Sequence, residues 1–583
     1  MGTDDRTTNQ LTPRDAGCNA GCNAGRNAGC DAPSQPHALP VDLEDVSNLL
    51  ARVDKLNQLG IALSSEHDTK KLLENILLGA KDLTNADAGT MYTKTEENSL
   101  KFQIIRTDSL KIAMGGTTGV DIPFPPLPLY KSDGEPNLQM IAAAAALQDI
   151  TINIPDAYEA EGFDFTGTKK FDQMTGYRSK SFLTVPLKNH EREIIGVLQL
   201  INAKDFQTGE IRPFSIRDQQ LAESLASQAA ISMTNQRLIE DLKKLFESFI
   251  KTIANAIDDK SPYTGGHCER VPVLSEMLAR AAARSDIGEL KDYHPSEDDL
   301  YELRIAAWMH DCGKVVTPEY VVDKATKLQT IYDRIHSVNA RFDVLKRDAE
   351  VAFLRQKIAA MEQGDVTRIP ELEAAYHQQL AQIQDDQKFV QTTNIGGEFM
   401  TADRKKRIQE IGEKKWVNCD GELVNFLTED EIKNLCIAKG TLTDEEREII
   451  NHHVVATKNM LKNLNFPKQL KRVPEMAGSH HETMNGKGYP EGLTRDQMSI
   501  GARIMAIADV FEALTASDRP YKPAKTLSES LKILGFMKKD QHVDPDLFQV
   551  FIKEQVYLEY AQQYLDPKQI DEIVPKKIPG YEP

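Results

Sequence analysis

The sequence predicts a multidomain protein in which an α/β domain precedes a long connector helix and an all-α domain that carries a helical insertion. Three observations lead to this fold class. A strand hairpin pattern lies in the N-terminal half, a heptad repeat follows it, and histidine–aspartate motifs lie in apolar helical runs further on. With 583 residues, the chain can form roughly three or four domains with cores of their own.

The composition excludes several classes of protein. Lys and Arg number 70 against 88 Asp and Glu, a net charge of −18, which argues against a broad basic surface for polymeric nucleic acid. The N-terminus lacks the basic start and apolar core of a secretory signal. No apolar stretch is long enough to cross a bilayer, so we expect no membrane partner. A small phosphorylated ligand held by local cations or metals stays compatible with this charge.

Residues 1–41 are a low-complexity segment that we expect to be disordered. An Asn-Ala-Gly repeat recurs from Cys18 to Cys30, with almost no bulky apolar side chain. Such a segment buries too little apolar surface to offset the entropy of ordering. The seven cysteines of the chain are scattered, which indicates reduced thiols in a cytoplasmic protein; the role of those in the tail stays open.

Residues 42–235 have the pattern of one α/β domain. Leucines at helical spacing open it, and strand-like runs follow at 90–92 and 102–106. The strongest hairpin pattern joins residues 182–188 to residues 194–202 through a polar turn, and a long helix begins shortly after.

This order of elements resembles a GAF domain, a fold that senses small molecules. Asn202, Lys204, Phe214 and Asp218 partly match the signature of that family, but Gln219 stands where its final acid is expected. The resemblance implies an unidentified small ligand. The alternative, which we favour for the signature residues, is that they only hold the fold.

Residues 236–258 predict a connector helix with a heptad seam. Its positions step alternately by four and three residues: Leu238, Leu242, Leu245, Phe249, Thr252 and Ala256. Such a seam fits either a core helix packed within one chain or a parallel dimer. We favour a homodimer, in which the helix would carry a change from the first domain to the next.

Residues 329–440 predict a helical insertion. Two charged stretches with few helix breakers, 331–361 and 370–389, precede Gly396 and Gly397. We expect a helical hairpin that interrupts the C-terminal domain, which would comprise residues 259–328 and 441–583. A solvated structural or partner-binding arm is the default interpretation.

Histidine–aspartate motifs in apolar helical runs predict a metal site. His310 and Asp311 follow one such run, and Asp509 lies inside another. A buried carboxylate needs a metal or a charged partner, and imidazole with carboxylate suits Fe, Mn or Zn better than Ca. Adjacent ligands diverge by about 100° on a helix, so a doublet fits two metals or a bridging carboxylate. Two nearby metals would stabilise both oxygens of a phosphoryl displacement.

The full set of motifs is more specific than any single pair. In chain order they are Thr264-Gly-Gly-His267-Cys-Glu-Arg270, His310-Asp-Cys-Gly-Lys314, Leu442-Thr-Asp-Glu-Glu-Arg with His453, His480-His-Glu-Thr-Met-Asn-Gly-Lys-Gly-Tyr-Pro490, Ala508-Asp509, and Asp518-Arg-Pro-Tyr-Lys522. They resemble the HD-GYP family, a branch of the HD phosphohydrolases that hydrolyse cyclic di-GMP. The resemblance implies metal-dependent cleavage of that phosphodiester to pGpG, with GMP as a further product to test.

The resemblance also implies a role for each matching residue. The metal ligands would be His267, His310, Asp311, His453, His480, His481 and Asp509. Asp311 would bridge two divalent ions, for which Fe or Mn is favoured over Zn, Mg or Ni. Lys314 would hold positive charge against the phosphoryl oxygens. Arg519 and Lys522 would bind the other phosphate or a guanine edge.

The chain departs from the family pattern at several positions. Tyr263 stands where some members place a glutamate for a third metal, so we expect two metals. Met484 and Asn485 replace the usual Trp and Asp, which predicts a changed pocket wall. The fourth ligand has two candidates: His336 lies at the family's usual distance, but the residues around His453 fit the motif better, and we favour His453.

Two alternatives to cyclic di-GMP hydrolysis stay open. One keeps the chemistry and changes the base, as in cyclic GMP-AMP. The other is a non-catalytic signalling adaptor that binds partners through the insertion. The complete ligand set argues against the adaptor, because loss of catalysis would permit loss of ligands.

Overall fold

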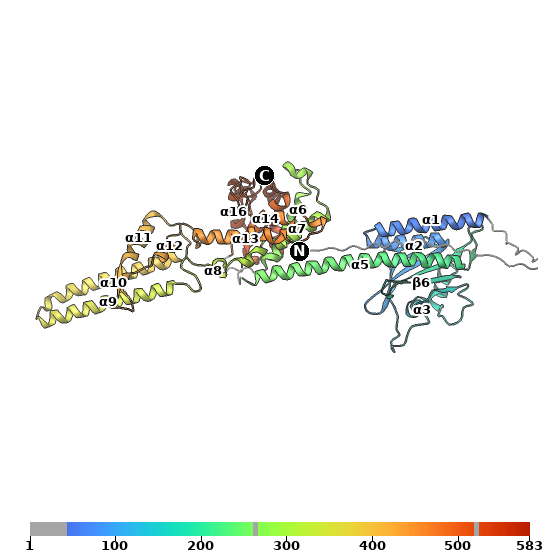
Figure 1. Cartoon of the computed structure of the whole chain (residues 1–583), viewed down its shortest axis with the longest axis horizontal. Helices are drawn as coiled ribbons and strands as arrows, with labels where there is room; N and C mark the ends of the chain where they lie inside the picture. The colour runs from blue at the N-terminus through green and yellow to red at the C-terminus, as the bar shows by residue number, and fades with distance from the viewer. Residues whose placement is uncertain (1–42, 261–265, 518–523, 583) are drawn as a thin grey trace, which may run out of the picture. The chain divides into compact units, whose positions relative to one another are not determined.

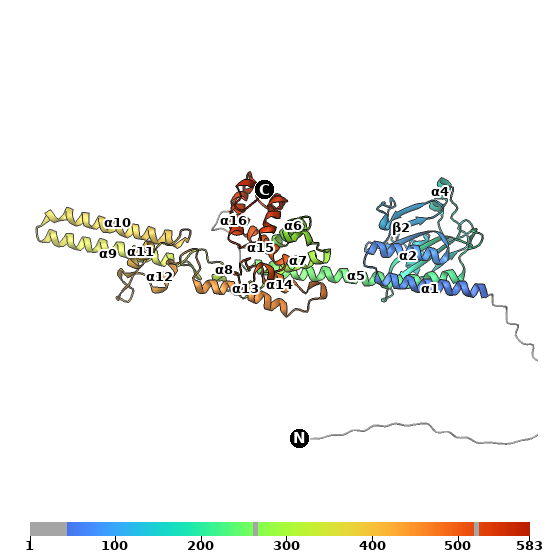
Figure 2. The same ribbon diagram turned by 90° about the horizontal axis from the view of Figure 1, so that it is seen from above.

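The computed structural model describes residues 43–260, 266–517 and 524–582. They belong to two compact units, residues 1–239 and 240–583, each described by itself. The predicted fold class is confirmed, because the first unit is α/β and the second is mainly helical (Figures 1 and 2). The tail at residues 1–41, expected to be disordered, lies outside the described residues. None of the described helices combines the length and apolar character that a bilayer crossing requires.

The first unit is a mainly antiparallel sheet with helices on both faces. Its elements are α1 (Leu43–Ser65), α2 (Thr69–Thr84), β1 (Ala86–Lys94), β2 (Ser99–Thr107), β3 (Ile112–Gly115), β4 (Leu127–Pro128), α3 (Ile141–Gln148), β5 (Ile152–Ile154), α4 (Thr166–Thr175), β6 (Phe182–Lys188), β7 (Ile194–Lys204), β8 (Ile211–Arg212) and the start of α5 (Ile216–Asp258). The strand order is β3-β2-β1-β7-β6-β5, and the hairpin predicted from the sequence is present as β6 and β7.

Two apolar layers enclose this sheet. Helices α1, α2 and α5 pack leucines and alanines against one face, while α3 lies on the other (Figure 1). Helix α3 is a run of alanines, and Ala142, Ala143 and Ala146 pack directly against Tyr92 and Val197 of the sheet. Small side chains let the helix backbone approach the strands closely, so apolar side chains fill the space beneath α3.

The second unit is built around a helical core. Its elements outside the insertion are the end of α5, α6 (His267–Ala282), α7 (Glu297–Met309), the 3-10 helix η3 (Cys312–Val316), α8 (Glu319–Val322), α13 (Asp444–Lys462), α14 (Val473–Gly478), α15 (Ile500–Thr515), α16 (Leu527–Lys539), α17 (Pro545–Lys553) and α18 (Val556–Tyr564). Ile250 and Ala254, near the end of α5, belong to this core, together with apolar residues of α6, α7 and α15. The last turns of α5 are therefore part of the second unit.

The insertion has a core of its own. Its elements are α9 (Ile335–Glu362), α10 (Ile369–Asn394), α11 (Ala402–Glu413), β9 (Lys415–Val417), β10 (Leu423–Asn425) and α12 (Glu429–Leu435). Helices α9 and α10 lie side by side as a hairpin (Figures 1 and 2). Phe342 of α9 packs on Phe426 with ring centres 4.5 Å apart, within an apolar cluster that also includes residues of α10, α11 and α12.

Beside the expected helical hairpin, the insertion contains a small two-stranded sheet that was not predicted. Strands β9 and β10 pair through a turn in which Asn418 accepts hydrogen bonds from the backbone of Asp420 and Glu422. Gly421 supplies the positive φ of 80° that this turn requires. Two strands of three residues are too short to show a period of two in the sequence.

Candidate metal centre

The seven predicted ligands converge from five helical segments of the second unit. His267 opens α6, His310 and Asp311 follow α7, His453 lies in α13, His480 and His481 follow α14, and Asp509 lies in α15. The helices bring their side chains together although about 240 residues separate the first from the last, and their atoms form groups within 4.8 Å of one another.

One group of ligand atoms surrounds a single oxygen of Asp311. The Nε2 atom of His267 lies 3.3 Å from His310 Nε2, 3.3 Å from Asp509 Oδ1 and 3.5 Å from Asp311 Oδ2. His310 Nε2 is also 3.3 Å from Asp311 Oδ2. Two imidazoles and the Asp509 carboxylate thus face a common point together with Asp311 Oδ2. This arrangement fits one divalent ion.

The second group lies on the other side of the same carboxylate. His453, His480 and His481 place their ring nitrogens within 4.8 Å of one another. His453 Nε2 is 3.2 Å from Asp311 Oδ1, the oxygen that does not face the first group. Asp311 therefore lies between two groups of ligands, as a bridging carboxylate would.

Backbone carbonyls set the tautomer of three of these histidines. The Nδ1 atoms of His310 and His480 donate to the carbonyl oxygen three residues earlier, at 2.7 and 2.6 Å, and that of His453 does the same. A proton held on Nδ1 leaves the Nε2 lone pair available. Each ring therefore presents the nitrogen that can bind a metal to the centre of the site.

Three buried atoms in the centre make no hydrogen bond among the described residues, although two of them, His453 Nε2 and Asp311 Oδ1, lie 3.2 Å apart. They are Asp311 Oδ1, His453 Nε2 and His480 Nε2. A buried polar atom left unpaired costs about 1–3 kcal/mol. Imidazole nitrogens and carboxylate oxygens are ligands of divalent transition metals, so the residues present fit the two ions that the sequence predicts.

For Asp311, His480 and His481, the electrostatics favour the forms that bind cations. Burial opposes the charge of Asp311, but Lys314 and His310 outweigh it and hold the pKa of this carboxylate well below its usual range. Burial lowers the pKa of His481 to about 4 and that of His480 well below its ordinary value. At neutral pH the carboxylate is ionised and both imidazoles are neutral, as metal ligation requires.

The sequence analysis missed Glu512, which supports His267. Its carboxylate accepts from His267 Nδ1 and, at 2.7 Å, from Arg270 Nε. Burial alone lowers the pKa of His267, but the charge of Glu512 and hydrogen bonds to Asp311 and Asp509 raise it well above its ordinary value. Glu512 lies three residues after Asp509 in the apolar run of α15, a spacing that puts both on one helix face and could have identified it.

A close backbone contact between η3 and α13 fixes the two ligand groups relative to each other. Thr457 of α13 accepts from the Gly313 amide at 2.8 Å and donates to the His310 carbonyl at 3.1 Å. A Cβ on Gly313 would collide with the carbonyl oxygen of His453. Glycine is therefore required where η3 meets α13, and this contact fixes His453 relative to His310.

The loop after the histidine doublet is organised by Glu482. Its buried carboxylate accepts from the amides of Glu491, Gly492 and Leu493 at 2.7, 3.1 and 2.9 Å. The Tyr489 ring stacks on His481 with centres 5.0 Å apart, and a Cβ on Gly488 would collide with the Glu482 backbone. The peptide bond between Tyr489 and Pro490 is cis. The Gly-Tyr-Pro segment is thus fixed against one of the ligand histidines.

Other predicted residues have different environments. Lys314 Nζ lies 2.5 Å from Asp311 Oδ2, beside both ligand groups. His336 lies exposed at the start of α9, outside these groups. Asn485, expected in a pocket wall, bonds Thr483 and the Lys487 amide in its own loop and the Asp540 carbonyl at the end of α16. Tyr263, Arg519 and Lys522 lie outside the described residues.

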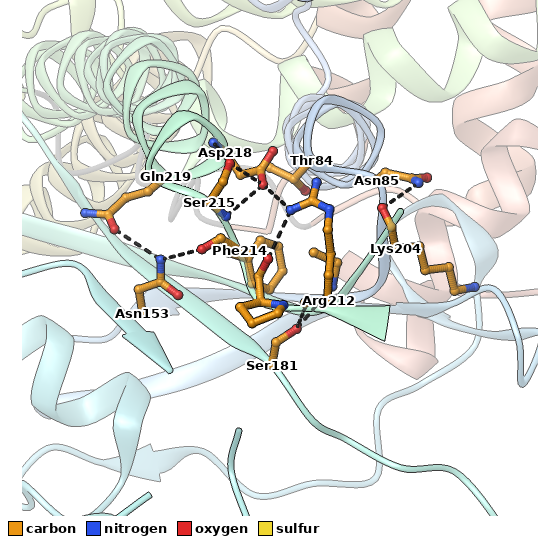
Figure 3. Close-up of polar contacts among 12 residues, drawn as sticks. Thr84, Asn85, Asn153, Ser181, Lys204, Arg212, Phe214, Ser215, Asp218 and Gln219 are labelled. Atoms are coloured by element: carbon orange, nitrogen blue, oxygen red, sulfur yellow. Dashed lines mark hydrogen bonds and ion pairs between the residues drawn. The ribbon is translucent and has the colours of Figure 1, made fainter. Parts of the chain in front are cut away.

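The signature residues of the first unit make a different kind of cluster (Figure 3). Asp218 is fully buried and pairs with Arg52 at 2.5 Å and Arg212 at 2.6 Å, while Ser215 also donates to it. Asn153 donates to the Phe214 carbonyl at 3.1 Å and to Gln219 at 3.3 Å. These contacts join α1, β8 and the start of α5.

Asn202 and Lys204 are held in the same way. Asn202 accepts from the Lys180 amide at 2.7 Å and donates to the Arg178 carbonyl at 2.8 Å. Lys204 pairs with the buried carboxylate of Asp87. The polar signature side chains therefore form hydrogen bonds or ion pairs with other residues of the same domain.

Comparisons with known proteins assign both units. The GAF domain family matches residues 68–233, and the HD domain family matches residues 429–547, which include His453, His480, His481 and Asp509. The GAF domains of phosphoenolpyruvate-protein phosphotransferases from Acinetobacter and Coxiella burnetii are 16% and 13% identical. Each covers 33% of this chain, with 98% and 99% of its own length aligned and TM-scores of 0.24 and 0.26.

Curated relatives match parts of the chain. A 3'3'-cGAMP-specific phosphodiesterase of Vibrio cholerae is 38% identical over 111 residues, which are 19% of this chain and 23% of the relative. A cyclic di-GMP phosphodiesterase of Pseudomonas aeruginosa is 36% identical over 114 residues, 20% of this chain and 26% of the relative. A second Vibrio cholerae 3'3'-cGAMP-specific phosphodiesterase is 22% identical over 336 residues, 58% and 40% of the two chains.

The match thus spans only about a quarter of the length of the first two of these relatives, and less than half of the third. The family matches nevertheless agree with the antiparallel sheet of the first unit and with the helical second unit. The chain therefore contains a GAF domain in its first unit and a domain of the HD family in its second.

Proposed function

We propose that the protein is a metal-dependent phosphodiesterase that hydrolyses a cyclic dinucleotide, with cyclic di-GMP as the first candidate, to a linear product. The observation that carries this proposal is Asp311, a buried carboxylate whose two oxygens face two separate groups of metal-binding side chains. Relatives named as cyclic di-GMP and 3'3'-cGAMP phosphodiesterases support the same chemistry.

His267, His310 and Asp509 would hold one divalent ion, and His453, His480 and His481 the other, with Asp311 between them. We favour Fe or Mn, with Zn, Mg or Ni as alternatives. When bound, two such ions supply Lewis-acid charge to both oxygens of a phosphoryl displacement.

The side chains of this protein would orient the substrate and hold its charge. Lys314 keeps an ammonium group beside Asp311, and the charge of Asp311 raises its pKa against the effect of burial, so it stays a cation at neutral pH. This positive charge would stabilise the negative charge on a phosphoryl oxygen as the phosphodiester bond breaks. Arg519 and Lys522 are proposed to bind the second phosphate or a guanine edge. These local cations would attract an anionic substrate to a chain of net charge −18.

The base specificity needs a direct comparison of substrates. We propose to incubate the full chain with cyclic di-GMP and, separately, with 3'3'-cGAMP, and to follow pGpG, GMP and the other linear products by chromatography. Metal content is measured on the same samples. Asp311→Ala is expected to lose metal and hydrolysis together; hydrolysis that persists in a metal-free variant would disprove the mechanism.

A parallel dimer is proposed for the connector. In the described chain, large apolar residues of the heptad seam lie exposed: Leu238, Leu242, Leu245 and Phe249 are between 49% and 64% exposed. Ile250 and Ala254 on another face of α5 are buried in the core of the second unit, so the exposed stripe is not needed for packing within the chain. Heptad spacing suits a second copy of the same helix, which would bury this stripe.

The dimer is testable without activity. Sedimentation of the full chain should give twice the monomer mass, and Leu242→Asp with Phe249→Asp should reduce it to the monomer. Lys243→Asp, on another face of α5, is the control. An unchanged mass in the double variant would reject this seam.

All cysteines in the described part of the chain are free, in accord with the cytoplasmic location that we propose.

A further inference from the structure

We infer that two side chains position the metal centre: Asp258, the last residue of α5, and Lys260, in the turn that follows it. The inference rests on the proposed function for its kinetic readout, but its metal readout stands without it. Neither residue was assigned a role by the sequence analysis, and neither is one of the seven proposed ligands.

Lys260 holds the turn that carries Lys314. Its ammonium group donates to the carbonyl oxygens of Lys314, Val315 and Thr317 at 3.2, 2.6 and 2.7 Å. These carbonyls belong to the end of η3 and the residue that follows it, a segment that begins directly after Asp311. A single cation that binds three carbonyls from one turn fixes the path of that turn.

Asp258 holds the start of the helix that carries His267. Helix α6 begins after Gly266, which offers no side chain to bind the free amides of its first turn. Asp258 supplies one: its Oδ2 accepts from the Cys268 amide at 3.0 Å, and the residue is only 5% exposed. The carboxylate therefore binds the residue next to His267 and anchors the helix of His267 to the end of α5.

The two contacts act on different components of the site. Asp258 acts through α6 on the group formed by His267, His310 and Asp509. Lys260 acts through η3 on Lys314, the cation proposed to face the substrate. Both are positioning residues, because each acts through the residue that it orients. Asp258 ends α5 and Lys260 follows two residues later, so a small displacement at this end of the helix would reach both the metal group and Lys314.

The Lys260 contact predicts a change in kcat rather than in metal content. In the full chain, Lys260→Met is expected to lower kcat with the cyclic dinucleotide by at least about tenfold, with KM and metal stoichiometry nearly unchanged. Lys260→Arg keeps a cationic donor and should recover most of kcat. Lys243→Met, on an exposed face of the preceding helix α5, is the control and should match the wild type.

The Asp258 contact predicts a change in metal binding. Asp258→Ala removes the acceptor at α6 and should weaken one of two metal-binding steps by about tenfold or more in a titration with Mn²⁺ alone. Asp258→Asn keeps an acceptor oxygen and should bind Mn²⁺ nearly as the wild type does. The second binding step should be unchanged in both variants.

The outcomes separate this inference from the proposed function. If the wild type binds two metals but hydrolyses neither cyclic dinucleotide, the proposed function fails and the Mn²⁺ titration still decides the inference. Wild-type kcat in Lys260→Met, or wild-type metal binding in Asp258→Ala, would overturn it. Should Lys260→Met unfold, the comparison of Asp258→Ala with Asp258→Asn carries the test, since a general loss of stability would weaken both binding steps equally.

Discussion

The metal centre of the HD domain and the signature cluster of the GAF domain are both buried polar groups, yet they differ in what they leave unpaired. In the GAF domain, Asp218 is paired by two arginines and a serine. In the HD domain, Asp311 Oδ1 and two imidazole nitrogens make no hydrogen bond among the described residues. Because unpaired buried atoms are costly, they identify a place where an external group completes the structure. A motif whose hydrogen bonds are complete holds the fold instead.

The largest effect should come from removing one of the unpaired nitrogens. His453→Ala is expected to lose the metal of its group and to lower hydrolysis by at least about a thousandfold, about 4 kcal/mol in activation free energy. His336→Ala, at the exposed alternative position, should retain both metals. Metal analysis and product chromatography of both variants check this. Metal loss confined to His336→Ala would reverse the assignment.

Removing Asp218 from the GAF cluster should lower the free energy of unfolding and leave the metal content intact. Asp218→Ala leaves Arg52 and Arg212 without their buried carboxylate and should destabilise the GAF domain by about 3 kcal/mol. Denaturant unfolding followed on the full chain, together with metal analysis, measures both effects. A loss of metal with unchanged stability would contradict the distinction between the two clusters.

An intermediate effect is expected at Glu512, which is itself paired but supports a ligand. Glu512→Gln keeps the shape of the side chain and removes the charge that orients His267, so metal affinity should fall by about 10- to 100-fold. Titration with Mn²⁺ measures this. Glu289→Gln, a carboxylate of another ion-pair network in the same unit, serves as the control and should bind Mn²⁺ like the wild type. Equal affinity in Glu512→Gln and the wild type would remove Glu512 from the site.

The smallest effect is the pH dependence of the GAF cluster. Burial alone raises the pKa of Asp218, but Arg212, Arg52 and Ser215 outweigh it and lower the pKa below the ordinary 3.8. The stabilisation from this carboxylate is therefore complete above its unfolded pKa and is lost as pH falls through the lower folded value. Unfolding free energies of the wild type and Asp218→Asn should converge from about pH 4 downward. A constant difference across that range would exclude Asp218 as the titrating group.

Much of the fold could be predicted because it depends on local patterns. Strands β6 and β7 coincide with two apolar runs joined by a polar turn. Helices α9 and α10 coincide with charged stretches that contain few helix breakers. The sheet of β9 and β10 could not, since each strand is too short for its period to be visible. At the site, the candidate ligands were predicted from their motifs. The spacing of Glu512 from Asp509 could have identified a further carboxylate, but its contact with His267 depends on packing between α6 and α15.

The sequence by itself determined the candidate metal ligands, because the ligand types and their short motifs are local features. The tertiary structure decided how they are grouped. It put His453 beside Asp311 across a long insertion and turned the two oxygens of Asp311 toward different groups. It also brought Lys260 to the turn of Lys314. These distances follow from how helices pack, since packing joins residues that are far apart in the chain, and no local pattern records it.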